Sequence, residues 1–260
     1  MPVNSGWKNF IIQLMPVIDI NCDMGEGIGN DEMIMPFISS ANIACGYHAG
    51  SETIIRQTIE FAKKNNVSVG AHPSFFDREN FGRTEMHLAA EKIYDLIILQ
   101  LRIIKKIAKH QQVQLHHVKP HGALYNMSAK DPTIANAIAH AVKDFDEDLI
   151  LFGLSGSCSI KEADQLKLKT AGEVFADRTY QADGTLTPRS QTNALIEDTA
   201  KSVQQVLQII MEGTVTAVNG NKISITADTI CLHGDGKNAV EFARAISQSL
   251  KQNNIEIKAI

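Results

Sequence analysis

The feature that most constrains this fold is a regular alternation, along the whole chain, of short apolar runs with segments of helical periodicity. Seven of the runs have the length of buried strands. A strand-then-helix order repeated in this way is typical of a parallel sheet whose crossover connections are helices. The strands are predicted at 17–22, 42–45, 67–71, 114–119, 149–153, 171–176 and 229–233.

Helices are predicted between these strands. In the segment 87–110, apolar residues recur at every third or fourth position, as on the buried face of a helix. Ser51 is a suitable N-cap, and Asp131 followed by Pro132 combines an N-cap with a favoured first helical residue. The predicted helices are 51–65, 87–110, 131–145, 192–211 and 237–251.

The segment 214–226 departs from this rhythm, because its residues alternate around Asn219-Gly220 and predict a β-hairpin before the last strand. The strand pattern is compatible with an open doubly wound sheet, but an unbroken succession of units favours a barrel. We therefore predict an α/β fold, a seven-stranded parallel β/α barrel, as one domain over residues 16–260. Residues 1–15 are predicted to be an N-terminal extension, with Met15 as a possible start.

Composition excludes several classes of partner. The net charge is −4 and no long basic run is present, which argues against nucleic acid and anionic membranes. No apolar segment reaches the roughly 18 residues of a transmembrane helix. The four cysteines are widely spaced and form no C-x-x-C pair, which argues against a zinc ribbon or a disulfide framework and fits a reduced, cytoplasmic protein.

Polar side chains gather where six of the seven predicted strands end. A parallel barrel carries its active site at the C-terminal ends of its strands. One histidine or aspartate in such a position would more often be structural, but the coincidence at six ends predicts a shared pocket. The residues are, in strand order, Asn21, Asp23 and Glu26; His48; His72, Asp77, Arg78 and Arg83; Lys119 and His121; Glu173, Asp177, Arg178 and Tyr180; and His233 and Asp235.

Two near-motifs do not support the functions they suggest. The stretch "GLSGS" lacks the final glycine of a nucleophile elbow, so a loop contacting phosphate or carboxylate is favoured over a nucleophilic Ser155. The stretch "LHGDGKNA" lacks both the leading glycine and the Ser or Thr of a Walker motif, so ATP would bind in another way or on another subunit. The cysteines at strand ends are interpreted as buried packing residues: Cys22, Cys45 and Cys231.

These motifs resemble those of the LamB/YcsF family. The matching stretches follow the family's order between about residues 17 and 250, and long irregular motifs of this kind are specific. They are "IDINCDMGEG", "SSANIACGYHAGS", "VGAHPSFFDRENFGR", "HVKPHGALYN", "GEVFADRTYQADGTLTPRS" and "TICLHGD".

The resemblance implies a barrel of the glycoside hydrolase/deacetylase type and a start at Met15. It also implies an ATP-dependent cyclic amide hydrolase, a 5-oxoprolinase that opens 5-oxoproline (pyroglutamate) to L-glutamate with ADP and phosphate. Family members act with two further subunits, B and C, which could share the ATP site. After "TPRS" the chain reads "QTNALIED" in place of the family's glycine-containing stretch, so ligand contacts at 190–193 depart from the pattern.

The implied reaction needs a cation for the substrate carboxylate, a base for water, and a donor for the developing oxyanion or phosphate. Asp23 or His72 is the candidate base, and Lys119 and His121 are the candidate donors. The expected catalytic residues are Asp23, His72, Lys119, His121 and Glu173. The expected substrate contacts are His48, Arg78, Arg83, Tyr125, Asp177, Arg178, Arg189, His233 and Asp235, with the carboxylate held by Arg78, Arg83 or Arg189.

Two other functions stay open. Deacetylase-type barrels often bind a divalent metal through an aspartate and two histidines, and Asp23, His48 and His72 follow three consecutive strands. A metal-dependent deacetylase or amidohydrolase acting on a small amide or carbohydrate is therefore the first alternative. The second is a non-catalytic binding protein within the complex, against which the concentration of ionisable groups argues. Assembly into a homo-oligomer is compatible with each reading.

Overall fold

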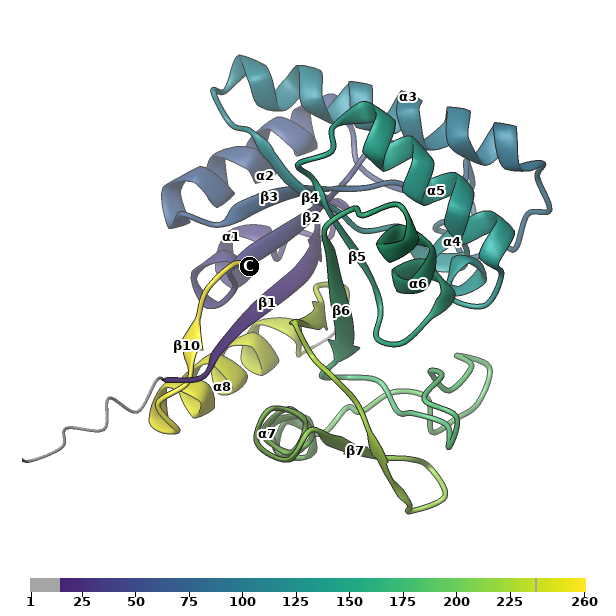
Figure 1. The fold of residues 1–260 in the computed structure, drawn as a ribbon. Helices are drawn as coiled ribbons and strands as arrows, with labels where there is room; N and C mark the ends of the chain where they lie inside the picture. The colour runs from purple at the N-terminus through teal and green to yellow at the C-terminus, as the bar shows by residue number, and fades with distance from the viewer. Residues whose placement is uncertain (1–14, 237) are drawn as a thin grey trace, which may run out of the picture.

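A closed ring of seven parallel strands forms the centre of the computed structural model, which describes residues 15–236 and 238–260 (Figure 1). Strand β1 pairs with β2 on one side and with β9 on the other, which closes the ring. The predicted seven-stranded β/α barrel is confirmed. The strands are β1 (Val17–Met24), β2 (Ser40–Ala44), β3 (Ser68–His72), β4 (Leu115–Val118), β5 (Ile150–Leu154), β6 (Thr170–Phe175) and β9 (Thr229–His233).

Helices surround the ring, with α3 and α5 packed side by side (Figure 1). The two predicted N-caps are confirmed: Ser51 accepts a hydrogen bond from the Ile54 amide, and Asp131 accepts from Thr133 and Ile134. The helices are α1 (Asp31–Ile34), the 3-10 helix η1 (Met35–Phe37), α2 (Glu52–Asn65), α3 (Ala90–His110), α4 (Gly122–Ser128), α5 (Pro132–Phe145), α6 (Cys158–Gln165), α7 (Thr199–Glu212) and α8 (Ala239–Gln252). Of these, α1, η1, α4 and α6 were not predicted.

The predicted helix 192–211 is wrong at its start, because α7 begins only at Thr199. Asp198 caps α7 by accepting a hydrogen bond from the Lys201 amide. The preceding residues form turns and a loop, in which the Ala194 carbonyl accepts from the Thr179 amide and from the Arg178 guanidinium. Helix α8 begins at Ala239, and residue 237 of its predicted range lies outside the described residues.

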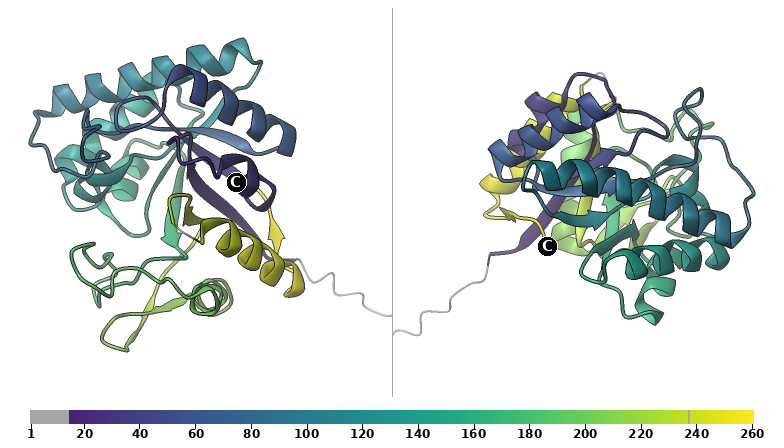
Figure 2. Two further views of the ribbon diagram at one scale, coloured as in Figure 1. Left: turned by 180° about the vertical axis from the view of Figure 1, so that it is seen from behind. Right: turned by 90° about the horizontal axis from the view of Figure 1, so that it is seen from above.

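The predicted hairpin is confirmed as β7 (Thr214–Thr216) paired with β8 (Lys222–Ser224). Gly220 takes a φ of +85°, and its amide donates to the Ala217 carbonyl, as the tight turn requires. The hairpin and the segment between β6 and α7 lie together on one side of the barrel, away from α2 and α3 (Figure 2). A hydrogen bond from the Val218 amide to the Tyr180 carbonyl joins them.

Strand β10 (Glu256–Ile257) runs parallel to the beginning of β1, outside the ring (Figure 2). The predicted N-terminal extension, residues 1–15, lies outside the described residues except for Met15. Among residues 15–236 and 238–260, none of the helices combines the length and apolar character that a membrane crossing requires.

A ladder of buried polar side chains fills the inside of the ring. Toward the N-terminal ends of the strands, the Asp19 carboxylate accepts hydrogen bonds from the hydroxyls of Ser39, Ser40 and Thr229. Above it, Asn42 donates to the side chains of both Asn21 and Asp23, at 2.7 and 2.9 Å. These bonds replace those lost to water on burial, and they orient Asp23 at the C-terminal end of the ring.

Candidate active site at the carboxyl ends of the strands

A cavity of about 1040 Å³ opens at the C-terminal ends of the strands. Its floor carries four of the five predicted catalytic residues: Asp23, His72, Lys119 and His121. Its walls come from α4, from the loop that opens α6 and from the segment 183–190. The cavity is therefore assembled from loops that are far apart in the sequence, as expected for a parallel barrel.

Lys119 is the centre of the cavity floor. Its ammonium lies 2.9 Å from Asp23 Oδ1, 2.8 Å from Glu173 Oε1 and 3.0 Å from Cys231 Sγ, and its side chain is 3% exposed. Burial disfavours the charge, but Asp23 and its neighbours outweigh burial and raise the pKa of Lys119 well above its usual value. A buried lysine that stays charged between two carboxylates is a fixed cation and hydrogen-bond donor on the cavity floor.

The segment around Lys119 is attached to the neighbouring strand by its backbone. The Lys119 amide donates to the Ala71 carbonyl, and the His121 amide donates to the Pro73 carbonyl. Pro120 lies between them and has no amide hydrogen to satisfy. These backbone bonds fix the path of the chain as it leaves β4, so that the side chains of Lys119 and His121, on either side of Pro120, both line the cavity.

Asp23 is the second charged group on the floor. Its Oδ1 accepts from Lys119 and Asn42, while its Oδ2 lies 3.3 Å from His72 Nε2. Burial opposes ionisation, but His72 and Lys119 hold the pKa of Asp23 well below its usual value. The carboxylate is therefore ionised, and Oδ2 is the oxygen turned away from the lysine.

Glu173 and Tyr125 are buried beside Lys119 with spare hydrogen-bonding capacity. The contact of Glu173 with Lys119 is an ion pair without hydrogen-bond geometry, and within the described residues neither carboxylate oxygen has a hydrogen-bond partner. The Tyr125 hydroxyl is likewise buried without a partner in the described part of the chain. Burial and the charge of Glu173 raise the pKa of Tyr125 well above its usual value, so this phenol is a donor.

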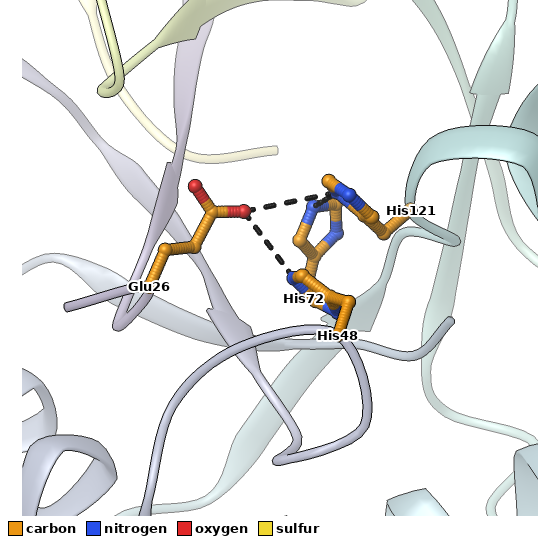
Figure 3. A group of neighbouring side chains, drawn as sticks. All are labelled: Glu26, His48, His72 and His121. Carbon is orange, nitrogen blue, oxygen red and sulfur yellow. Dashed lines mark hydrogen bonds and ion pairs between the residues drawn. The ribbon is translucent and has the colours of Figure 1, made fainter. Parts of the chain in front are cut away.

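Three histidines and a glutamate form a second group beside the floor (Figure 3). One ligand atom from each of Glu26, His48, His72 and His121 lies within 4.8 Å of the other three. Burial and the neighbouring rings lower the pKa of His48, and burial and His72 lower that of His121 to about 3, so both rings are neutral. Burial raises the pKa of Glu26 well above its usual value, and Asp23 adds to the effect.

This group differs from the predicted metal ligands Asp23, His48 and His72. His48 and His72 are included, but Glu26 stands in place of Asp23, and His121 joins them. Asp23, Cys231 and His233 also lie close enough together to share an ion. Protein cations already occupy that second group, since Lys119 lies 3.0 Å from Cys231 and Arg189 lies 3.2 Å from His233.

The predicted substrate-binding arginines fall into two pairs, of which the first braces loops. Arg78 donates to the carbonyls of Gly46 and Gly50, at 2.8 and 2.9 Å, and is not among the cavity-lining residues. Arg178 lines the cavity but donates to the carbonyls of Thr187 and Ala194, which holds the cavity wall against β6. Each of these two guanidinium groups already donates to two backbone carbonyls. Neither one therefore presents a free pair of N–H groups for bidentate binding of a carboxylate.

The second pair lines the rim of the cavity. Arg83 Nη2 lies 2.8 Å from Asp235 Oδ2, and the Arg83 side chain is 40% exposed. Arg189 Nη2 lies 3.2 Å from Nε2 of His233, whose Nδ1 lies 2.8 Å from Asp177 Oδ2. Because Asp177 accepts the Nδ1 proton, His233 offers an acceptor to Arg189, and the three groups form one chain along the rim.

Sequence reasoning did not single out Asn42 or assign Glu26 a role. Asn42 is fully buried, and its side chain links Asp23 to His117 at 2.9 and 2.8 Å. An asparagine within an otherwise apolar strand was the available signal. Ser190 lines the cavity, whereas residues 191–193 do not.

Comparison with known proteins agrees with this geometry. The family model described as "LamB/YcsF family" matches residues 18–260. The chain is 51% identical to the A subunit of 5-oxoprolinase from Tolumonas auensis, over 95% of this chain and 100% of that protein. It is 50% identical to the corresponding A subunit from Oceanobacillus iheyensis, over 93% of this chain and 96% of the relative.

Solved structures agree as well. A lactam utilization protein from Thermus thermophilus superposes with a TM-score of 0.88 at 40% identity, covering 94% of this chain and 100% of the other. A family 4 carbohydrate esterase from Streptomyces lividans, at 12% identity and a TM-score of 0.50 over 94% of this chain and 93% of the other, shares the fold alone. Because the family model spans nearly the whole chain and relatives are about half identical along it, this protein belongs to the LamB/YcsF family.

Proposed function

We propose that this chain is the A subunit of a 5-oxoprolinase and contributes catalytic groups to the ATP-dependent opening of 5-oxoproline to L-glutamate. Its relatives of about 50% identity are named as the A subunit of that enzyme, and they match along almost their whole length. The observation that carries the proposal is the buried Lys119 ammonium, held between Asp23 and Glu173 on the floor of the cavity.

The chemistry of a lactam explains why such a group is needed. The ring amide is stabilised by resonance, and opening it requires negative charge to develop on the amide oxygen. Lys119 supplies a fixed positive charge to that oxygen from a buried position on the cavity floor. The Tyr125 hydroxyl, which lacks a partner among the described residues, supplies a neutral donor beside it.

A base is required for the attacking water. Asp23 Oδ2 and His72 Nε2 lie 3.3 Å apart, and both residues line the cavity. Either one could accept a proton from water, and the proton is then delivered to the ring nitrogen as the C–N bond breaks. Comparing the kcat of Asp23→Asn with that of His72→Gln shows which of the two residues is the base, because its replacement should lower kcat more.

ATP activates the lactam for this attack. Transfer of the γ-phosphoryl group to the amide oxygen releases ADP and makes the ring carbon an electrophile. Water then attacks that carbon, the C–N bond breaks, and a second water releases phosphate to leave L-glutamate. The cavity is larger than the lactam requires, and its outer part carries Lys130, Lys161 and Arg189, which are suited to phosphate groups.

The substrate carboxylate is expected at the rim. Of the three arginines considered for it, Arg83 and Arg189 line the cavity, whereas Arg78 is bonded to two backbone carbonyls. We assign the carboxylate to Arg189, because its 3.2 Å contact with His233 is one that a carboxylate can replace. Arg83 is already paired with Asp235.

The experiment that tests the function measures glutamate and phosphate release from 5-oxoproline and ATP. It compares this chain alone, subunits B and C alone, and all three together. Turnover is expected only in the full mixture. Lys119→Met is expected to lower kcat by about 10²–10³-fold, as for removal of an oxyanion donor.

The matched control is Lys169→Met, since Lys169 is 59% exposed and pairs with Asp148 on the surface. Size-exclusion chromatography must show that both variants still assemble with subunits B and C. Full turnover by an assembled Lys119→Met complex would make this chain the non-catalytic binding member of the complex. No turnover in any mixture would refute the assignment of 5-oxoproline as the substrate.

A further inference from the structure

The group formed by Glu26, His48, His72 and His121 has a property that the ring-opening proposal does not use. Its members come from the loops or strand ends of four successive strands, β1 to β4, and their side chains are nearly inaccessible, at 0–7% exposure. One ligand atom from each of these separate loops lies within 4.8 Å of the other three (Figure 3). Three buried imidazoles around one carboxylate need a physical reason to face one another.

The nitrogen of each imidazole that points away from the group lies within hydrogen-bond distance of an oxygen, and two of these oxygens are backbone carbonyls, which only accept. His72 Nδ1 lies 2.7 Å from the Lys119 carbonyl, and His121 Nε2 lies 2.8 Å from the Phe81 carbonyl. His48 Nδ1 lies 2.8 Å from Ser74 Oγ, whose own hydrogen is donated to the Phe75 carbonyl. The tautomer of each ring follows from these partners, because the far nitrogen must carry the hydrogen.

The remaining nitrogens, Nε2 of His48, Nε2 of His72 and Nδ1 of His121, border the same space. His72 Nε2 and His121 Nδ1 are only 2.9 Å apart, and Asp23 Oδ2 lies 3.3 Å from His72 Nε2. His48 Nε2 and His121 Nδ1 lie 3.3 and 3.7 Å from Glu26 Oε1. Nitrogen and carboxylate ligand atoms gathered in one buried space are stabilised by a positive charge between them.

We propose that these four side chains form a site for one divalent transition-metal ion of the zinc type. Imidazole nitrogens with one carboxylate oxygen are a donor set that suits Zn²⁺ and not Mg²⁺ or Ca²⁺. Ligands about 2.0–2.1 Å from a tetrahedral ion lie roughly 3.4 Å apart, close to the separations from Glu26. Donation of the far ring hydrogen to a fixed oxygen is also what orients histidines that bind metal.

Binding would require a small rearrangement within the group. The rings of His48 and His121 are stacked in parallel, with centroids 3.9 Å apart, so they would tilt to direct both lone pairs at one ion. The ion would border the cavity through His72 and His121, where it would act as a Lewis acid. His72 would then be a ligand, which leaves Asp23 as the base.

The test uses the full-length chain, stripped with a chelator and titrated with Zn²⁺ in a calorimeter. One equivalent is expected to bind. Glu26→Gln and His121→Ala should weaken binding by more than the roughly 10–100-fold that loss of an outer hydrogen-bond partner costs, and Ser74→Ala should fall within that range. The matched control is His140→Ala, because His140 is exposed on α5 and should leave binding unchanged.

Co²⁺ provides a second readout, because its visible spectrum reports the ligands directly and should change in His121→Ala but not in His140→Ala. Circular dichroism confirms that each variant is folded. Failure of the wild-type chain to bind a stoichiometric ion, or unchanged affinity in Glu26→Gln and His121→Ala, would overturn the site. The 2.9 Å contact between His72 and His121 would then be an ordinary hydrogen bond between the two rings. Neither titration requires substrate or ATP, so this inference and the proposed function can fail separately.

Discussion

The ring of His117 occupies the space beside Gly70 that any side chain there would need. A Cβ at residue 70 would lie 2.1 Å from His117 Nε2. The ring is fully buried and stacks on Phe152 with centroids 4.2 Å apart, and its Nε2 lies 2.8 Å from the side-chain oxygen Oδ1 of Asn42. The glycine on β3 is therefore what allows a histidine on β4 to reach the polar ladder inside the ring.

Gly70→Ala is expected to destabilise the protein by about 1–3 kcal/mol, because the histidine must leave its position or the strands must separate. Urea unfolding followed by circular dichroism measures the change. Gly236→Ala is the control, since a Cβ there meets no atom within 4 Å. Equal stability of the two variants would mean that the barrel adapts without cost.

Cysteine reactivity should follow burial. Cys22, Cys45 and Cys231 are buried, and burial raises the pKa of each thiol, that of Cys45 to about 12. Cys158 is partly exposed at the cavity wall. We expect a thiol reagent such as DTNB to modify one cysteine rapidly in the native chain and all four after unfolding. Rapid labelling that persists in Cys158→Ser would contradict this assignment.

Asp177 should contribute stability that depends on pH. Burial opposes its ionisation, but His233 outweighs burial and lowers its pKa below the usual value. A carboxyl with a lowered folded-state pKa stabilises the protein fully above its unfolded pKa of about 3.9, and loses that contribution as the pH falls through the folded value. The difference in unfolding free energy between wild type and Asp177→Asn should therefore be larger near neutrality than at acid pH. A constant difference would show that the carboxylate charge is not what matters.

Arg178 should control the order of the cavity wall. It is 5% exposed and donates to the carbonyls of Thr187 and Ala194. Arg178→Ala leaves both carbonyls without that partner, so a protease should cleave the segment 181–198 faster under native conditions. Arg102→Ala, on the exposed face of α3, is the matched control. Cleavage at the control rate would mean that the wall is held by its backbone bonds alone.

The fold could be predicted from the sequence because it depends on local patterns. Apolar runs of strand length, helical periodicity and the Asn219-Gly220 turn are each contained within a short window, and each predicted element has a counterpart in the structure. The start of α7 could not be predicted in this way. Its helical periodicity extends toward 192, but Arg178, which comes earlier in the chain, binds the carbonyl of Ala194 and holds that stretch in a turn outside the helix.

The sequence by itself determined which residue types stand at the strand ends, and the barrel rule predicted that they would meet there. Only the tertiary structure decided which of them pair. Lys119 lies between Asp23 and Glu173, Arg78 turns away to brace a loop, and Glu26 joins the histidines in place of Asp23. The physical reason is that burial makes every charge depend on its nearest partners, and those partners come from strands far apart along the chain, whose distances no local pattern encodes.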